Sequence, residues 1–158
     1  MPTIHLTTFI AAPAERVFNL SRSIELHKKS MAHSNEQAVA GTMMGLINKD
    51  ETVTWKAKHI GKTRVLKVRI TEMKSPVSFT DEMVSGDFKN MVHEHHFKPV
   101  NNGTLLIDLF SFETPYGSVG KFINSLFLTR YLRKLLEKRN EMIKDYAESD
   151  KWKFLLNK

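Results

Sequence analysis

The chain has 158 residues, of which 41% are hydrophobic and 26% are charged, and this composition excludes an intrinsically disordered chain and a helical membrane protein. The length suits one globular domain, and the absence of cysteine excludes disulfides, thiolate metal sites and a cysteine nucleophile. The formal net charge of +7 permits attraction to anionic surfaces, since clustered Lys and Arg displace counterions from phosphate-rich surfaces.

The N-terminal segment predicts a strand followed by two short helices. Residues 3–11 mix β-branched and apolar side chains, and Pro13 suits the first turn of a helix that runs to about Leu20. Ser21 or Ser23 is expected to cap the second helix. No positively charged region precedes the apolar stretch, so no signal peptide is predicted and a cytoplasmic location is expected.

The middle of the chain, residues 36–113, alternates apolar and polar side chains, which predicts an antiparallel meander with one buried face. Its turn signals are Ile60-Gly61, Lys74-Ser75-Pro76, Ser85-Gly86-Asp87 and Asn101-Asn102-Gly103. The expected strands between these turns are residues 53–59, 64–73, 77–84, 89–97 and 104–113.

A long helix is predicted from residue 119 to about residue 148, with Ser118 as its N-cap. Its apolar face is expected to contain Phe122, Ile123, Leu126, Tyr131, Leu135, Met142, Ile143 and Tyr146. We expect residues 1–148 to form one ligand-binding domain and residues 149–158 to form a basic amphipathic tail. The tail either folds back on the domain, stays disordered or contacts a membrane.

Hairpin geometry predicts which side chains share the buried face, because a turn fixes the register of the strands that it joins. Turns at Asn102-Gly103 and near Asp87 give the cross-strand pairs Phe97 with Asp108, His95 with Phe110, His93 with Asp81, and Met91 with Met83.

Four polar residues interrupt this apolar face: Asp81, His93, His95 and Asp108. A buried charge is costly unless it is paired or solvated, so we expect these groups to line a pocket and orient a polar head of a ligand. The predicted ligand-binding residues are Trp55, Phe79, Asp81, Met83, Met91, His93, His95, Asp108 and Phe110. The alternative is a pair of purely structural contacts, Asp81 with His93 and His95 with Asp108.

The same four residues leave two chemical alternatives open. His93-Glu94-His95 has the spacing of a strand-borne metal site and, with Asp81 or Asp108, would give two histidines and one carboxylate. A His–Asp pair would also suit proton transfer in a cyclase or dehydratase, so these four are the candidate catalytic residues. No metal and no cofactor are expected. His96 should point outward with Glu94, and no chemistry is assigned to His5, His27 or His33.

Several segments together resemble the SRPBCC superfamily, also called START-like or polyketide cyclase/dehydrase-like: TFIAAPAERVFNL, DETVTWKAKHIGK, TEMKSPVSFTDEMVSGDFKNMVHEHHF and NNGTLLIDLFSFETPYGSVG. Within it, the chain is most similar to small bacterial proteins described as cyclase/dehydrase or cell-division-inhibitor-like. The resemblance implies an α+β helix-grip fold, in which a seven-stranded curved antiparallel sheet wraps around a long C-terminal helix, with two short helices after the first strand. Fold alone does not decide the activity.

We therefore expect a binding or carrier protein for a small apolar or amphipathic molecule, such as a lipid, a quinone or a polyketide-like compound. A cyclase- or dehydratase-type enzyme that uses the same cavity is the alternative. Weak membrane-surface contact through the basic C-terminal helix and tail is a further hypothesis, and nucleic acid is not expected as a partner, because no nucleic-acid-reading motif is present.

Overall fold

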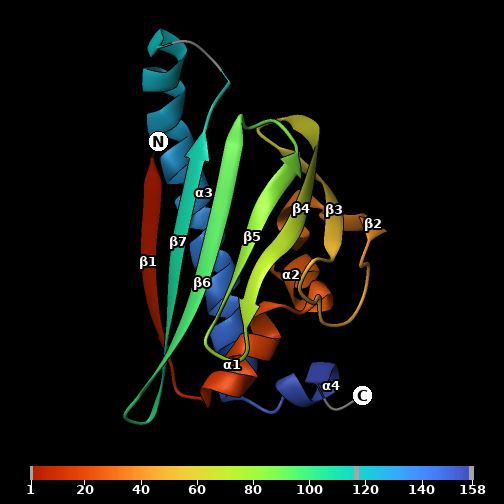
Figure 1. The fold of residues 1–158 in the computed structure, drawn as a ribbon, viewed down its shortest axis with the longest axis vertical. Coiled ribbons are helices and arrows are strands. Elements are labelled where there is room, and N and C mark those ends of the chain that lie inside the picture. Colours follow the sequence, from red (N-terminus) through yellow and green to blue (C-terminus); the bar gives the residue numbers. More distant parts are fainter. Residues whose placement is uncertain (1, 116–117, 157–158) are drawn as a thin grey trace.

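The computed structural model describes residues 2–115 and 118–156, with side chains for residues 2–115 and 126–156. These described residues form seven strands and four α-helices (Figure 1). The strands are β1 (Thr3–Ile10), β2 (Gln37–Gly41), β3 (Thr52–His59), β4 (Lys62–Lys74), β5 (Ser78–Ser85), β6 (Asn90–Val100) and β7 (Gly103–Glu113). The α-helices are α1 (Ala14–Ser21), α2 (Ile24–Ser30), α3 (Ser118–Glu148) and α4 (Trp152–Leu156), and a 3-10 turn, η1, covers Ala32–Ser34. No helix in the described residues is long and apolar enough to span a membrane.

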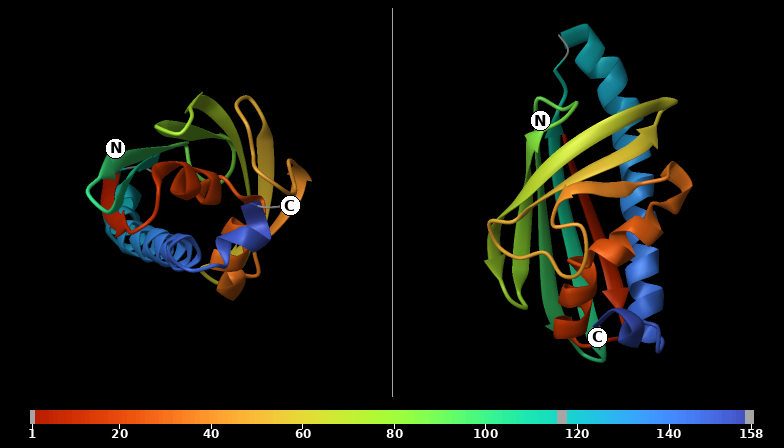
Figure 2. Two further views of the ribbon diagram at one scale, coloured as in Figure 1. Left: turned by 90° about the horizontal axis from the view of Figure 1, so that it is seen from below. Right: turned by 90° about the vertical axis from the view of Figure 1, so that its right-hand side faces the viewer.

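All seven strands form one antiparallel sheet in the order β1-β7-β6-β5-β4-β3-β2. The sheet curves, and α3 lies along its open side with α1 and α2 beside it (Figure 2). Helix α3 has 31 residues, about 46 Å at 1.5 Å per residue, so it spans the length of the sheet. This arrangement is the helix-grip fold that the resemblance implies.

The two short helices begin where the sequence predicts. Pro13 precedes α1 with φ −62°, which is preorganised for a helix start. Ser23 caps α2, since its hydroxyl accepts a hydrogen bond from the Leu26 amide at 3.2 Å. The other predicted cap, Ser21, instead donates to the Val17 carbonyl within α1 at 2.8 Å.

The register predicted between β6 and β7 is wrong by two residues. The turn lies at Asn101-Asn102, so His95 faces Asp108 and not Phe110 across the strands. A Cβ on Gly103 would lie 2.3 Å from the Ile10 carbonyl oxygen, so this glycine allows close approach of β1 rather than the turn itself. A two-residue shift leaves every side chain on its predicted face. The predicted pair of β5 and β6, Asp81 with His93, is confirmed.

Helix α3 faces the sheet with a stripe that contains Leu136, Ile143 and Ala147, all buried. Leu126, predicted on this face, is 57% exposed, because this part of the helix lies outside the packed stripe. The helix starts at Ser118, but the side chains of Ser118, Phe122 and Ile123 lie outside the described residues.

The C-terminal segment folds back on the domain. Helix α4 contacts α1, and the Arg16 guanidinium lies 4.2 Å above the Trp152 ring. Trp152, Leu155 and Leu156 are half-buried against the core, whereas Phe154 is exposed. Most of the apolar side chains of the predicted tail are therefore covered by protein.

Candidate functional site

A cavity of about 460 Å³ lies between the concave face of the sheet and the helices. This volume is within the range typical of small-molecule sites, and most of the wall is apolar. The sheet contributes Trp55, Ala57 and Phe110, while α3 contributes Leu132 and Leu136. An apolar space of this size can hold the body of a ligand without further rearrangement of the fold.

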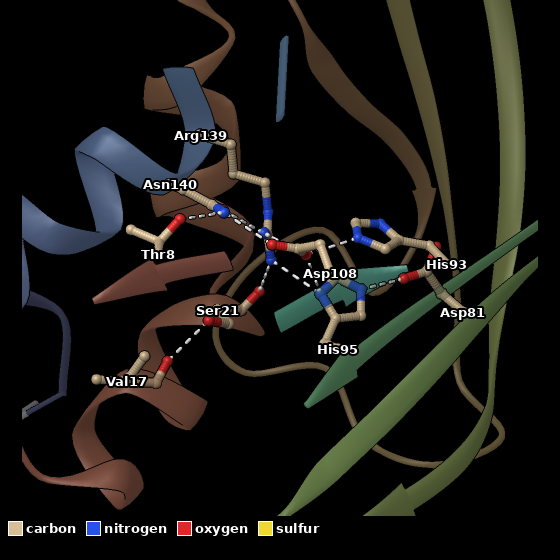
Figure 3. Close-up of polar contacts among 9 residues, drawn as sticks. All are labelled: Thr8, Val17, Ser21, Asp81, His93, His95, Asp108, Arg139 and Asn140. Atoms are coloured by element: carbon tan, nitrogen blue, oxygen red, sulfur yellow. Dashed lines mark hydrogen bonds and ion pairs between the residues drawn. The ribbon is translucent and has the colours of Figure 1, made fainter. Parts of the chain in front are cut away.

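The floor of the cavity contains the predicted polar residues, but their contacts are diagonal rather than directly cross-strand (Figure 3). His93 Nε2 lies 2.7 Å from Asp108 Oδ1, and His95 Nε2 lies 2.7 Å from Asp81 Oδ2. The two imidazole rings overlap, with centroids 3.7 Å apart. The predicted structural pairs, Asp81 with His93 and His95 with Asp108, are therefore exchanged, although His95 Nδ1 also approaches Asp108 Oδ1 at 3.5 Å.

Two residues of α3 complete this floor, and neither was predicted from the sequence. Asn140 Nδ2 donates to Asp108 Oδ2 at 2.7 Å, and Arg139 Nη1 lies 3.5 Å from Asp108 Oδ1. Arg139 Nη2 also donates to the Ser21 carbonyl at 3.2 Å and to His95 Nδ1 at 3.3 Å. Both residues fall in the inner stripe at helical spacing from Leu136 and Ile143, which is the sequence signal that could have identified them.

The carboxylates of this network are ionised and His93 is neutral. Burial alone would raise the pKa of Asp108, but the hydrogen bond from His93 and the charge of Arg139 place it well below its usual value. Burial would likewise raise the pKa of Asp81, but the hydrogen bond from His95 and the charge of Arg139 lower it. Burial is the largest cause that lowers the pKa of His93, to about 4.

The geometry of the floor tests the metal hypothesis. Asp81, His93 and His95 each offer one ligand atom within 4.8 Å of the others. A metal on His95 Nε2 would require the proton on Nδ1, which would then face the Arg139 Nη2 donor at 3.3 Å. The guanidinium charge opposes a cation at the same place. The donor set therefore does not fit a metal site.

Seven of the nine predicted ligand-binding residues lie in the cavity wall: Trp55, Phe79, Asp81, Met91, His93, His95 and Phe110. Asp108 is fully buried behind the histidines and Met83 is outside the wall, so the structure places neither against the cavity. Phe79 stacks on the His95 ring with centroids 4.1 Å apart, which holds that imidazole in place.

A second polar cluster lines the cavity at a distance from the floor, and it includes His27, to which the sequence analysis assigned no chemistry. His27 Nε2 lies 2.6 Å from Glu36 Oε1, and the His27 ring packs 4.2 Å from the Trp55 ring. His59 Nδ1 lies 2.7 Å from the Tyr131 hydroxyl, and partial burial lowers the pKa of His59. This cluster links α2, β3 and α3. No pattern in the sequence joins these distant positions.

The outward histidine prediction agrees with the structure, since the side chains of His96 and Glu94 are both partly exposed and their nearest atoms, His96 Nε2 and Glu94 Oε1, lie 3.2 Å apart. They are outside the cavity wall.

No protein-family model matches the chain, and no curated protein sequence matches it. Solved structures do resemble it. The KanY protein (ms6282) has a TM-score of 0.69 and 19% identity, over 94% of this chain and 100% of the other. The protein TTHA0849 from Thermus thermophilus has a TM-score of 0.67 and 19% identity, over 90% and 97% of the two chains. The major latex-like protein 151 from Panax ginseng has a TM-score of 0.65 and 14% identity, over 94% and 98%.

Proposed function

We propose that this chain, which has the helix-grip fold of the SRPBCC proteins, is a binding or carrier protein for a small amphipathic molecule. The observation that supports this most strongly is the cavity of about 460 Å³ between sheet and α3, whose wall is mostly apolar and carries polar groups at the floor and in a second cluster. Such a cavity suits a ligand with an apolar body and one polar end, as in lipids, quinones and polyketide-like compounds.

An acid–base enzyme is the alternative, and His93 carries it. Asp108 orients the imidazole through Nε2, as a carboxylate does for a general base. Yet burial lowers the pKa of His93 to about 4, so this imidazole is a weak base at neutral pH. Binding therefore explains the site better than proton transfer does.

Membrane contact through the C-terminal segment has less support than ligand binding. Phe154 is its one largely exposed apolar side chain among the described residues, since Trp152, Leu155 and Leu156 pack against the domain. A short segment with one exposed anchor binds a bilayer weakly.

The test is native mass spectrometry of the freshly purified protein, followed by fluorescence titration with pyrene, an apolar probe without polar groups. Ala57→Trp is the blocking variant, because Ala57 is 6% exposed and lies in the cavity wall on β3. Lys56→Trp is the control, since Lys56 is exposed on the opposite face of the same strand.

We expect an organic adduct or saturable pyrene binding in the wild type and in Lys56→Trp, and neither in Ala57→Trp. Bare protein that also fails to bind pyrene would contradict the proposal. Equal pyrene binding by both Trp variants would do the same, because it would place the probe outside the cavity.

A further inference from the structure

His93 presents a hydrogen-bond acceptor to the cavity. Its Nε2 lies 2.7 Å from Asp108 Oδ1, and since a carboxylate accepts, Nε2 must carry the proton. The neutral ring then has a lone pair on Nδ1. Among the described residues, the hydroxyls of Thr71 and Thr114 are the side-chain polar atoms that are both fully buried and without a hydrogen-bond partner. His93 Nδ1 also has no partner among these residues, but it does not belong to that fully buried group. It is therefore accessible from the cavity that His93 lines.

Asp81 presents a second acceptor beside it. Its Oδ2 accepts a hydrogen bond from His95 Nε2, and its side chain is 15% exposed and lines the cavity. Asp81 pairs with His93 across β5 and β6, and a carboxylate oxygen lies within 4.8 Å of a ring nitrogen of His93. One small head group can reach both residues.

The donors at the floor are already used by the protein itself. The terminal nitrogens of Arg139 face Asn140 Oδ1 at 3.0 Å, Asp108 Oδ1 at 3.5 Å, the Ser21 carbonyl at 3.2 Å and His95 Nδ1 at 3.3 Å. His95 donates through Nε2 to Asp81 and accepts at Nδ1 from Arg139, so its ring carries one proton. With His93 also neutral, two carboxylates and one guanidinium leave the floor with an excess of one negative charge. A ligand carboxylate would therefore meet Asp81 without a free cation to pair with.

We propose that the cavity selects ligands whose polar end donates hydrogen bonds, a hydroxyl being the simplest, and rejects ligands that end in a carboxylate. This inference rests on the proposed binding function and specifies the head group that the floor recognises. The hydroxyl would donate its proton to Asp81, close enough to His93 to change the environment of Nδ1, and the apolar body would lie along Trp55 and Phe110. By the same argument the floor disfavours the carboxylate of a free fatty acid, whereas it accepts alcohols and phenols of similar size.

The test compares four fluorescent probes of nearly the same shape at pH 7: pyrene, 1-hydroxypyrene, 1-methoxypyrene and 1-pyrenecarboxylate. Hydrogen bonds to charged groups correspond to roughly 10- to 100-fold in affinity. We expect 1-hydroxypyrene to bind the wild-type protein at least about tenfold more tightly than 1-methoxypyrene, with 1-pyrenecarboxylate the weakest.

Equal affinities for the hydroxyl and methoxy probes, or tightest binding of the carboxylate, would overturn the inference and leave the binding function intact. Failure of all four probes to bind would overturn the binding function and this inference with it.

A variant localises the effect. Asp81→Asn removes the charged acceptor, and we expect it to lower the affinity for 1-hydroxypyrene by about tenfold while leaving the affinity for pyrene unchanged. Glu82→Gln is the matched control on the opposite face of β5. An unchanged affinity of folded Asp81→Asn for 1-hydroxypyrene would overturn the assignment. If that variant does not fold, the wild-type probe series alone decides.

Discussion

Replacing Asp108 by Asn tests whether the buried polar floor stabilises the fold as one network. Asp108 is fully buried and accepts hydrogen bonds from His93 Nε2 and Asn140 Nδ2, each at 2.7 Å. An Asn amide has the same shape but only one acceptor oxygen. In either orientation of the amide, its NH₂ group faces one of these two donors, His93 Nε2 or Asn140 Nδ2. A change of the His93 tautomer would remove only the clash with His93. In every case Arg139 loses its nearest buried counter-charge.

The expected cost follows from these losses. Removing one partner of a buried charged pair costs about 3 to 5 kcal/mol, and the lost charged hydrogen bond overlaps with that figure rather than adding to it. We therefore expect Asp108→Asn to lower the free energy of unfolding by about 3 to 5 kcal/mol. For a chain of this size the corresponding fall in Tm is roughly 6 to 20 °C.

Urea unfolding followed by circular dichroism measures this loss. The matched control is Asp145→Asn, because Asp145 is half-exposed, pairs with Lys151 at 2.7 Å and should contribute at most about 1 kcal/mol. Arg139→Met alone and combined with Asp108→Asn completes a double-mutant cycle, in which the two losses should be less than additive. A loss for Asp108→Asn no larger than that of Asp145→Asn would refute the reasoning.

Three further predictions concern other parts of the chain. The pKa of His93 is lowered to about 4, so between pH 6.5 and 4 the unfolded chain binds a proton at this histidine that the folded chain does not. The free energy of unfolding should therefore fall by roughly 3 kcal/mol as the pH is lowered through this window. In urea titrations at several pH values, His93→Gln should lack this component. Ile60 adopts φ 54° before Gly61 at φ 70°, a backbone conformation that Asn tolerates better than a β-branched residue does. Ile60→Asn should therefore raise the free energy of unfolding by about 1 kcal/mol, and a decrease would contradict the turn geometry. Trp152→Ala should lower the free energy of unfolding by about 2 kcal/mol, because it removes the packing under Arg16. Phe154→Ala, at an exposed position, should change it by no more than about 0.5 kcal/mol. Equal effects of the two variants in thermal unfolding would contradict the docking of α4.

Strands β1 and β3 to β7 could be predicted from the sequence because their alternation is strong, whereas β2 was not among the expected strands. A register error of two residues at Asn101-Asn102 still left Asp81, His93, His95 and Asp108 on the concave face, since side-chain direction repeats every second residue. Strand pattern does not fix side-chain rotamers, however. The diagonal pairing of His93 with Asp108 depends on the overlap of the two imidazole rings, which no spacing rule contains.

The contribution of α3 could not be predicted in the same way. Arg139 and Asn140 are charged or polar residues in a helix, which ordinarily face solvent, and the sequence analysis followed the apolar positions alone. The cluster of His27, His59 and Tyr131 likewise depends on tertiary contacts between segments far apart in the chain. Arg139 and the cluster of His27, His59 and Tyr131 line the cavity, so the sequence pattern predicted only part of its polar surface.

The most direct test of the proposed binding mode is a ¹⁵N NMR spectrum of the histidine side chains, recorded at pH 7 with and without 1-hydroxypyrene. We predict that free His93 is the neutral tautomer with its proton on Nε2, and that the probe shifts the His93 Nδ1 resonance while His96, outside the cavity, stays unchanged. A doubly protonated His93, a proton on Nδ1, or a bound probe that leaves Nδ1 unshifted would contradict the claim that the cavity floor accepts a hydrogen bond from the ligand.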